Sequence, residues 1–523
     1  MALNNYSILS IRCFSLDTVI RRIKYFYDEY KTIFWSIYLL NIIVYSYLLT
    51  QVGFTNHTFP QSWVYHFPSY RTYSEGRWFS DLVTWLFGAA GVQSFQMYIS
   101  VAIHIINSIF VTKIFSLNNR STVWLSVLFL SLYPAILDRY SFPGSQIMYV
   151  VSDALAISSI MILKNYRHNF KVLFWAAILF SLSLGTYQPA IAFYLLLALI
   201  VVLLRLENNN CRFFEELRNI STITMALLSG LALYYTLTKL IFLVSGSAPS
   251  FRNKTNSTVE VIEQIYGAYP AFVKYFTSGA DYLPSIFHWL PLTLIIVGII
   301  SIISKLRRAG YVKLMLGVLL ILVIPIALRA TYIINNQTFD NLGRLVYQNG
   351  HALLFFIVSI NITCSAKTIV NLVLCFFVYF MTITAKQEVN RAYLKIFYDT
   401  NMINRIVTRI DNTVPDIYDR KLSVVVVGYL SMKNNKYTTY SNNSNMSEFR
   451  SEAFVNYRQP EFLNFYYGSD IFDRPTPGDL DSALKSIGSR RPWPSQDSVY
   501  LNGNTVVVLL QEYKPGVPTT WTR

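Results

Sequence analysis

The sequence predicts a polytopic α-helical membrane protein, GT-C-like in its arrangement of spans, with a small α/β domain at its C-terminus. About eleven apolar stretches follow one another between Ile33 and Ala385, and a bilayer core needs about 20 mostly apolar residues per helix. Only 14% of the residues are charged, whereas a soluble domain carries about 25%. From residue 386 to residue 523 the chain is polar, and it has no stretch long enough to span.

Basic residues beside the apolar stretches predict the orientation, because the cytoplasmic side of a membrane protein holds their excess. Arg21, Arg22, Lys24 and Lys31 precede the first stretch and predict a cytoplasmic N-terminus. An odd number of spans then places the C-terminus outside, in the periplasm. The predicted spans are 33–49, 95–111, 122–137, 147–163, two short halves within 172–204, 220–244, 286–303, 314–328, 351–363 and 368–385.

Two of these spans carry unusual features. The block 172–204 is interrupted between Gly185 and Pro189, so it forms either two tilted spans or a re-entrant pair. The span 220–244 carries Lys239 near its outer end, where a lysine amine reaches the interface by snorkelling.

The predicted domains are a membrane domain at 1–385 and a periplasmic C-terminal domain at 386–523. Long outer loops at 50–94, 245–285 and 330–350 place the chemistry outside, because the cytoplasmic loops are short and basic. The stretch from Val261 to Phe276 has helical apolar spacing, which predicts a helix lying in the interface and kinked at Pro270.

Several function classes are disfavoured. The net charge of +16 does not indicate nucleic acid, because the basic residues lie between spans and not in one patch. The cysteines Cys13, Cys211, Cys364 and Cys375 lie outside the tail, so no disulfide frames it. No zinc spacing, phosphate-binding Walker loop or dinucleotide glycine pattern occurs. A nucleotide-sugar donor bound in the cytoplasm is therefore disfavoured.

The first outer loop is rich in aromatic and charged residues. Aromatic rings stack on sugar faces, and charged groups beside them hold phosphate or polarise a hydroxyl. An aromatic belt with a few solvated charges is the alternative interpretation.

Two segments resemble a known family. Ser69–Leu82 (SYRTYSEGRWFSDL), directly after the first span, resembles the Gly-Arg-Trp segment of O-antigen glucosyltransferases that use a polyprenyl-phosphate-linked glucose. Ser183–Ala190 (SLGTYQPA) is similar to their Tyr-Gln element at the outer face. These are the serotype-converting enzymes of the GT-C superfamily, and the resemblance covers residues 30–390. The chain departs from many relatives because Gln51–Ser74 contains no acidic residue.

The resemblance implies an enzyme of the bacterial inner membrane. It would move a glucosyl group from polyprenyl-phosphate-glucose to O-antigen polysaccharide on the periplasmic side, and so change the lipopolysaccharide serotype. Its implied partners are membrane lipids, a separate flippase and a glucosyltransferase that makes the donor, with no nucleic acid. We expect no cofactor, and a divalent metal at the departing phosphate is left open.

The implied mechanism assigns roles to residues of this chain. Inverting transfer needs a carboxylate that takes the acceptor proton and cations or a metal at the departing phosphate. Glu75 is the first choice for the base and Asp81 the second. Arginine grips phosphate oxygens with two hydrogen bonds, so the phosphate candidates are Arg71, Arg77 and Arg344, with Arg329 as a further one. The candidates for binding sugar or acceptor are Trp78, Tyr73, Tyr187, Gln188, Asp138 and Asp153.

Each of these residues also has a structural interpretation. Glu75 pairs with Arg71 or Arg77, Asp81 caps a helix, and the arginines bind lipid headgroups. Asp138 and Arg139 form a local ion pair at a turn. Asp153 is paired inside its span, and Tyr187-Gln188 belongs to a simple helix-breaking turn at Pro189.

The C-terminal segment predicts a small α/β domain. A helix is expected over Lys386–Asp411, with an apolar stripe, followed by a buried strand within Leu422–Leu430. A hairpin is expected at Asn502-Gly503, and 433–451 is expected to be a polar loop. The domain either binds the acceptor polysaccharide or only stabilises the protein. The aromatic residues proposed for stacking are Tyr457, Tyr466, Tyr467, Trp493 and Trp521.

Two other functions remain in competition. A polysaccharide polymerase or another lipid-linked-sugar transferase fits the spans, although Gly76-Arg77-Trp78 would then be accidental. A transporter of lipid-linked sugar would show broken or charged helices in paired halves. Only Asp153 and Lys239 are charged within spans, and no inverted repeat is evident.

Overall fold

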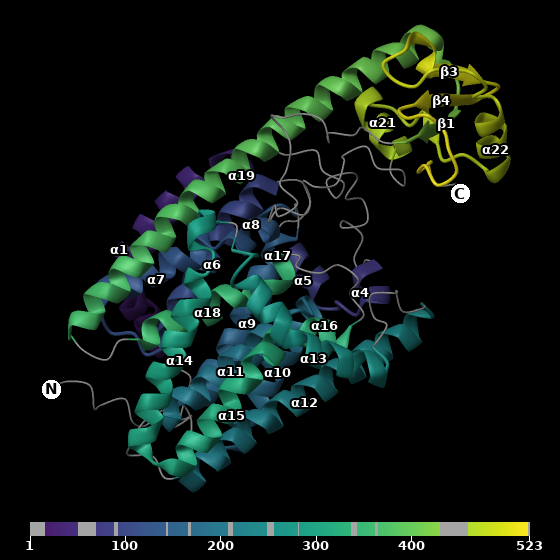
Figure 1. Ribbon diagram of the computed structural model, residues 1–523. Helices are drawn as coiled ribbons and strands as arrows, with labels where there is room; N and C mark the ends of the chain where they lie inside the picture. The colour runs from purple at the N-terminus through teal and green to yellow at the C-terminus, as the bar shows by residue number, and fades with distance from the viewer. Residues whose placement is uncertain are drawn as a thin grey trace.

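The computed structural model describes residues 16–50, 70–87, 93–142, 145–165, 169–207, 213–247, 256–280, 282–335, 343–360, 364–428 and 459–520. Long helices form one body, and a small sheet with short helices lies beyond it (Figure 1). The helices are α1 (Leu16–Val44), α2 (Ser46–Thr50), α4 (Tyr70–Glu75), α5 (Ser80–Leu86), α6 (Gln93–Ile114), α7 (Arg120–Leu132), α8 (Pro134–Tyr140), α9 (Gln146–Asn165), α10 (Phe170–Thr186), α11 (Ala190–Leu206), α12 (Phe213–Ser245), α13 (Thr258–Tyr275), α14 (Leu290–Ala309), α15 (Tyr311–Leu328), α16 (Ala330–Ile334), α17 (Gly343–Val346), α18 (Gln348–Ser359), α19 (Cys364–Thr413), α21 (Gln459–Tyr467) and α22 (Pro477–Lys485). The strands are β1 (Leu422–Val427), β2 (Phe472–Asp473), β3 (Val499–Asn502) and β4 (Thr505–Leu509).

Basic side chains lie together at one end of the helical body. The Lys164 amine donates to the Lys113 carbonyl oxygen at 2.8 Å, and the Arg205 guanidinium donates to the Lys164 carbonyl oxygen at 2.8 Å. The Lys305 amine lies 3.4 Å from the Glu207 carboxylate. These residues lie at the C-terminal ends of α6, α9, α11 and α14. The four helix ends therefore share one face, which we call the basic face.

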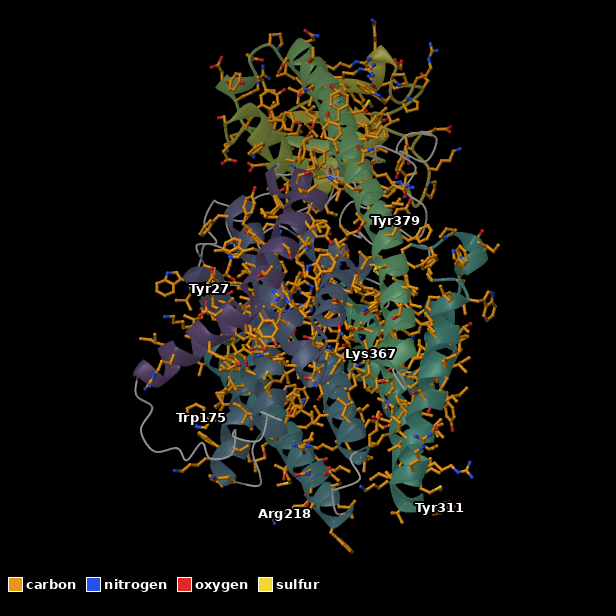
Figure 2. The ribbon with its side chains drawn as sticks, turned by 90° about the vertical axis from the view of Figure 1, so that its left-hand side faces the viewer. Tyr27, Trp175, Arg218, Tyr311, Lys367 and Tyr379 are labelled. Carbon is orange, nitrogen blue, oxygen red and sulfur yellow. The ribbon has the colours of Figure 1, made fainter. Side chains whose placement is uncertain are left out.

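The opposite end of the helical body, which we call the distal face, is the end nearer the C-terminal sheet. Figure 2 shows Arg218 and Tyr311, from the starts of α12 and α15, at the end farthest from that sheet. Both helices therefore run from the basic face toward the distal face. The long helix α19 runs the same way and carries the chain to the sheet (Figure 1).

Among the described residues, six helices are long and apolar enough to cross a bilayer: α6, α9, α12, α14, α15 and α19. The pair α7 and α8 makes a seventh if it is one span, bent by 51° at a break where α8 begins with Pro134. The other predicted spans coincide with α1, α10, α11 and α18. Helices therefore occupy all the predicted positions, but the predicted count of about eleven full spans stays a prediction.

The interrupted block 172–204 forms a helical hairpin. Its first helix, α10, follows the basic end of α9 after a short connection, and α11 ends at Arg205 on the basic face. Each helix has 17 residues, which is about 26 Å at 1.5 Å per residue. This length is less than the hydrocarbon thickness of about 30 Å. Two such helices are each short for a full span, so whether the block makes two tilted spans or a re-entrant pair stays a prediction.

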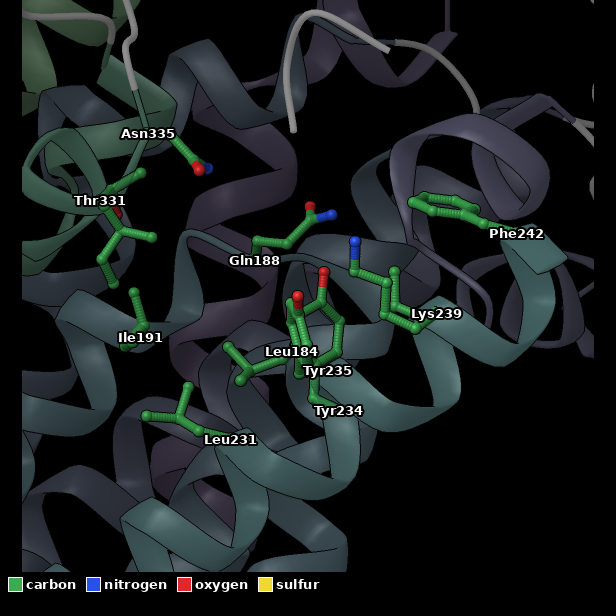
Figure 3. Close-up of a pocket in the computed structure, with 12 residues that line it drawn as sticks. Leu184, Gln188, Ile191, Leu231, Tyr234, Tyr235, Lys239, Phe242, Thr331 and Asn335 are labelled. Atoms are coloured by element: carbon green, nitrogen blue, oxygen red, sulfur yellow. The ribbon is translucent and has the colours of Figure 1, made fainter. Parts of the chain in front are cut away.

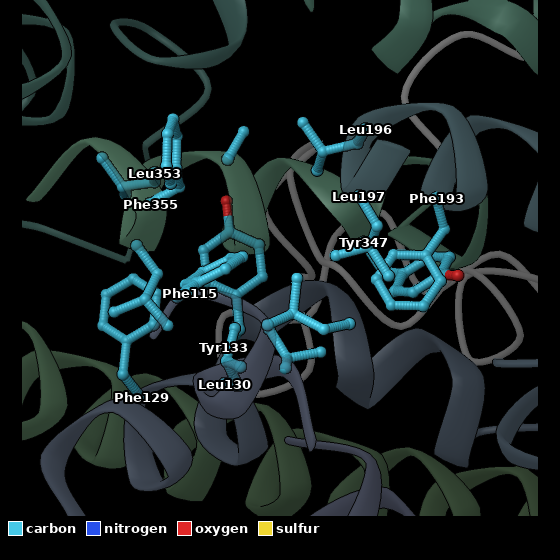
Figure 4. Packing of buried hydrophobic residues seen from close by; sticks show 14 of the residues in the cluster. Phe115, Phe129, Leu130, Tyr133, Phe193, Leu196, Leu197, Tyr347, Leu353 and Phe355 are labelled. Carbon is cyan, nitrogen blue, oxygen red and sulfur yellow. The ribbon is translucent and has the colours of Figure 1, made fainter. Parts of the chain in front are cut away.

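Aromatic side chains fill the centre of the helical body (Figure 4). The rings of Phe115 and Phe355 lie 5.6 Å apart, and those of Phe129 and Phe377 lie 5.8 Å apart. A Cβ at Gly350 would lie 2.7 Å from the Tyr133 ring, so the α18 backbone packs directly on that ring. All 12 residues of α18 are buried, and this helix is therefore surrounded by protein.

The helix predicted between Val261 and Phe276 is α13. It begins with a capping box, in which Ser257 and Glu260 exchange side-chain and backbone hydrogen bonds, and it contains Pro270. The helix is confirmed, while its place in the membrane interface stays a prediction.

A single helix of 50 residues, α19, joins the two bodies and runs through the predicted domain boundary. Val389 and Ala392 pack in the core of the helical body. Ile403, Ile406 and Ile410 pack in the core beneath the sheet. The apolar stripe predicted for the tail helix therefore contributes to both cores.

The C-terminal sheet has the strand order β2-β1-β4-β3. β1 is parallel to both of its neighbours, and β3 and β4 form an antiparallel hairpin with Asn502 opposite Thr505. Gly503 in this hairpin adopts a φ of +59°, which suits glycine. The predicted strand and hairpin are confirmed, and the predicted loop 433–451 lies outside the described residues.

Candidate active site

The turn between α4 and α5 depends on a glycine. Gly76 follows the end of α4 with a φ of +68°, a left-handed conformation that glycine adopts without steric cost. A Cβ at this position would lie 2.9 Å from Cγ2 of Thr238 and 3.1 Å from the Tyr234 hydroxyl, both on α12. Glycine therefore permits the turn and also its close approach to α12.

The same turn packs on the break between α10 and α11. A Cβ at Gly185 would lie 2.7 Å from the Trp78 ring, so the indole rests directly on the α10 backbone. The Phe79 N–H donates to the Gly185 carbonyl oxygen at 2.8 Å. Two segments about a hundred residues apart are thus fixed to each other by a ring contact and a backbone hydrogen bond.

Glu75, Arg77 and Gln188 form one polar network at this contact. The Gln188 amide nitrogen donates to the Glu75 carbonyl oxygen at 2.5 Å, and Arg77 Nε donates to Gln188 Oε1 at 2.9 Å. The Arg77 guanidinium lies 3.3 Å from the Glu75 carboxylate, whose side chain is only 7% exposed. Burial lowers the pKa of Arg77, but the Glu75 carboxylate and nearby groups raise that pKa above its ordinary value. The Arg77 guanidinium is therefore held charged next to the Glu75 carboxylate, beside the helix break.

A second network lies deeper in the protein. Arg139 donates to both Asp153 carboxylate oxygens, at 2.5 and 3.4 Å, and the Tyr347 hydroxyl donates to the same carboxylate at 2.6 Å. The predicted local pair between Asp138 and Arg139 is wrong, because Arg139 turns inward to Asp153 on α9. Asp153 is paired inside its helix, as one of its two interpretations stated.

Asp138 instead meets Arg344, which precedes α18. The Arg344 backbone N–H donates to Asp138 Oδ2 at 2.8 Å, and its guanidinium lies 3.7 Å from the same oxygen. The charge of Arg344 is near enough to influence the pKa of Arg77. The structure therefore brings the predicted Arg344 toward the network of Glu75.

Tyrosine rings connect these networks. The rings of Tyr149 and Tyr187 lie 4.6 Å apart. The Tyr187 ring lies 5.3 Å from the Arg77 guanidinium and 6.0 Å from the Arg139 guanidinium. The Tyr187 hydroxyl is buried and has no hydrogen-bond partner among the residues that the structure describes.

The remaining predicted site residues are Asp81, Tyr73, Arg71 and Arg329. Asp81 does not cap α5, since the N-cap is Phe79, and Asp81 accepts a hydrogen bond from the Thr72 hydroxyl at 2.7 Å. It thereby ties α5 to α4. Tyr73 lies half-buried on α4, while the side chain of Arg71 lies outside the described residues. Arg329 donates to Gln264 on α13 at 3.1 Å.

Comparison with known proteins identifies the family of this chain. The family model for glucosyl transferase GtrII matches residues 62–346, which is more than half of the chain. The chain belongs to this family. It is therefore a glucosyltransferase, and the matched range includes every site residue from Arg71 to Arg344. No curated protein and no solved structure matches the chain.

A cavity of about 390 Å³ lies beside the site of this glucosyltransferase, between the α10–α11 break, α12 and α16 (Figure 3). Gln188 belongs both to its wall and to the network of Glu75 and Arg77. The side chains of Tyr235 and Lys239 point toward Gln188 in Figure 3. The lining residues are Leu184, Gln188, Ile191, Leu231, Tyr234, Tyr235, Thr238, Lys239, Phe242, Thr331, Ile334 and Asn335.

The sequence analysis missed several members of this site. Tyr149 lies within a predicted span and Tyr347 at the end of the predicted outer loop 330–350, and neither belongs to a motif. Tyr234 and Asn335 carry no motif. Lys239 was the one visible signal, because a charge within a span is costly, and it was interpreted there as a snorkelling side chain.

The contact between Gly185 and Trp78 gives a prediction. In a Gly185→Ala variant the new methyl group meets the indole at a distance no Cβ tolerates, so the α4–α5 turn must shift. We expect glucosyl transfer to fall by about tenfold or more, since overpacking costs about 1–3 kcal/mol and the shift moves Glu75. The measurement is the transfer rate at equal amounts of purified protein.

Gly267→Ala is the matched control, because a Cβ there meets nothing within 4 Å on α13. It should keep the rate of the original chain. Equal rates for the Gly185 and Gly267 variants would contradict the packing described here.

The buried pair Arg139–Asp153 gives a second prediction. Asp153→Asn leaves the Arg139 guanidinium without its carboxylate in a buried site, and breaking such a pair costs about 3–5 kcal/mol. We expect a correspondingly lower free energy of unfolding, measured by denaturation of the purified protein in detergent. The double variant Arg139→Met/Asp153→Leu should recover most of this loss, because it leaves no buried charge unpaired.

Asp481→Asn serves as the control, because its pair with Lys485 is exposed on α22 and exposed pairs contribute little to stability. Equal losses of unfolding free energy in Asp153→Asn and Asp481→Asn would contradict this account of the buried pair.

Proposed function

We propose that this glucosyltransferase moves a glucosyl group from polyprenyl-phosphate-glucose to O-antigen repeat units, on the periplasmic side of the bacterial inner membrane. The observation that carries the proposal is the position of Glu75. It is held at the α10–α11 break next to a guanidinium, at the helix ends opposite the basic face. The resemblance of Gly76-Arg77-Trp78 and Tyr187-Gln188 to GT-C enzymes supports the class of donor.

The orientation follows from charge. Lys113, Lys164, Arg205 and Lys305 gather on one face, and the cytoplasmic side of a membrane protein holds the excess of lysine and arginine. We therefore assign the basic face to the cytoplasm. The distal face and the C-terminal sheet then face the periplasm, where a lipid-linked glucose and a polysaccharide can meet.

In the proposed reaction, an acceptor hydroxyl oxygen attacks the anomeric carbon of the glucosyl donor. The Glu75 carboxylate takes the proton of that hydroxyl as the new glycosidic bond forms. The bond between the anomeric carbon and the phosphate oxygen breaks, and the electron pair leaves with the prenyl phosphate. The proton on Glu75 later passes to solvent, so the chain ends unchanged.

The arginines suit the leaving group. A guanidinium stabilises the negative charge that grows on phosphate oxygen, because its donors match the phosphate in a two-bond arrangement. Arg77 is held by Gln188 and Glu75, and Arg344 approaches it from the segment before α18. When phosphate occupies Arg77, the Glu75 carboxylate loses part of its ion pair and becomes a stronger base.

The C-terminal sheet is proposed to bind the acceptor polysaccharide. Trp493 lies between the C-terminal sheet and α19, and the Arg409 guanidinium lies 4.2 Å from the Trp493 ring. The Tyr467 hydroxyl donates a hydrogen bond to the Asp411 carboxylate at 2.7 Å. Both rings therefore also stabilise the sheet. Tyr466 packs beside them, while Tyr457 and Trp521 lie outside the described residues.

The proposal is tested by transfer in vitro from polyprenyl-phosphate-glucose to purified O-polysaccharide. Glu75→Gln should lower the rate by at least about 100-fold, because general-base catalysis contributes about 10²–10⁴-fold. Asp81→Asn should have a smaller effect, since asparagine still accepts the Thr72 hydrogen bond. Glu263→Gln, the same change at an exposed position on α13, should leave the rate unchanged.

Full turnover of Glu75→Gln would show that another group is the base. Chain extension of the polysaccharide, or movement of the lipid-linked sugar across vesicles without transfer, would favour the polymerase or the transporter in place of this proposal.

A further inference from the structure

The cavity beside the α10–α11 break is bordered by α12, a helix long and apolar enough to cross a bilayer. α12 forms one wall, and the residues on its outward side are exposed: Tyr235 by 60%, Leu240 by 50% and Leu243 by 79%. In a helix that spans the bilayer, such residues face lipid chains. A molecule in the membrane can therefore reach the cavity sideways, without leaving the bilayer.

The cavity has an apolar part and a polar part. Leu184, Ile191 and Leu231 lie together at one end in Figure 3, and Gln188, Lys239 and Asn335 carry polar groups at the other. This division matches a ligand with an apolar chain and a polar head.

The charge of the polar part is positive. The 12 lining residues include Lys239 and no carboxylate. Within the described part of the chain Lys239 has no ion pair, and its amine lies 5.4 Å from the Tyr235 ring. Figure 3 shows this amine directed toward Gln188. Ammonium, hydroxyl and amide groups together form a donor set for an anionic head group such as a phosphate monoester or diester.

We infer that this cavity is the binding site for the prenyl-phosphate part of the donor and that Lys239 binds its phosphate. This inference rests on the proposed function. The first isoprene units occupy the apolar end, and the rest of the chain extends past α12 into the bilayer, because about 390 Å³ holds a head group and a short length of chain only. The sugar then lies toward Gln188, whose amide is bonded to Glu75 and Arg77.

The cavity also explains why a lysine is present in this span. A snorkelling lysine needs only the interface, whereas Lys239 lines the cavity and points toward Gln188 at the α10–α11 break. It is the one cation among the 12 lining residues, and Arg77 lies behind Gln188. The phosphate is thereby positioned before the sugar reaches Glu75.

The test measures binding to the full chain in phosphatidylcholine nanodiscs, with farnesyl phosphate as the probe and farnesol as its neutral counterpart. Lys239→Ala should weaken farnesyl phosphate by about tenfold or more, because hydrogen bonds to charged groups are the strong ones, and it should leave farnesol unchanged. Lys239→Arg should retain most of the affinity. Leu231→Trp, which fills the apolar end, should weaken both ligands.

Lys274→Ala is the matched control, because this lysine is exposed at the end of α13 and does not line the cavity. Unchanged farnesyl phosphate affinity in both Lys239→Ala and Leu231→Trp, or no binding to the original chain, would overturn the inference. Equal displacement of the probe by phosphatidic acid would also overturn it, since the cavity would then be a general phospholipid site. Because these readouts need no transfer, the base role of Glu75 can stand or fail separately.

Discussion

The site depends on one constraint, which is that buried backbone polar groups need hydrogen-bond partners inside the protein. Thr186, Tyr187 and Ala190 at the α10–α11 break are buried, so the peptide groups there cannot rely on water. Their neighbours supply hydrogen bonds instead. Phe79 donates to Gly185, Ser152 donates to the Ser183 carbonyl at 2.9 Å, and the Gln188 side chain bonds the α4–α5 turn. These bonds bring the α4–α5 turn and α9 to the break, and α12 packs on the same turn.

The buried charges follow from the same arrangement. Arg77, Arg139 and Arg344 each meet one carboxylate, from Glu75, Asp153 and Asp138 respectively. The deep pair is nearly sealed from solvent, with side chains exposed by 2% and 3%, so it holds α8, α9 and the segment before α18 in a fixed relation. The pair at the turn is more accessible, with Arg77 exposed by 17%. This gradient suits a rigid support behind a site where an arginine can exchange its partner.

Much of this fold was predictable, because a long apolar run is a strong signal. The described part of each predicted span is helical, and the Asn502-Gly503 hairpin formed as expected. The sequence also indicated Glu75, Arg77 and Gln188 as members of one site. The sequence did not show which charged side chains pair across the fold. Asp138 and Arg139 are neighbours in the chain, yet Asp138 pairs with Arg344 and Arg139 pairs with Asp153. The sequence likewise did not predict that Asp81 ties α5 to α4, because this depends on the position of the Thr72 hydroxyl on α4.

The side of the membrane on which the α4–α5 turn lies tests the account most directly. A cysteine is placed at Tyr73, two residues before Glu75, or at Arg307 near the basic end of α14, in a chain whose native cysteines are replaced. An impermeant maleimide is then applied to intact spheroplasts. Labelling at position 73, with labelling at 307 only after lysis, is the predicted result. Labelling at 307 in intact spheroplasts, with position 73 protected until lysis, would contradict the account.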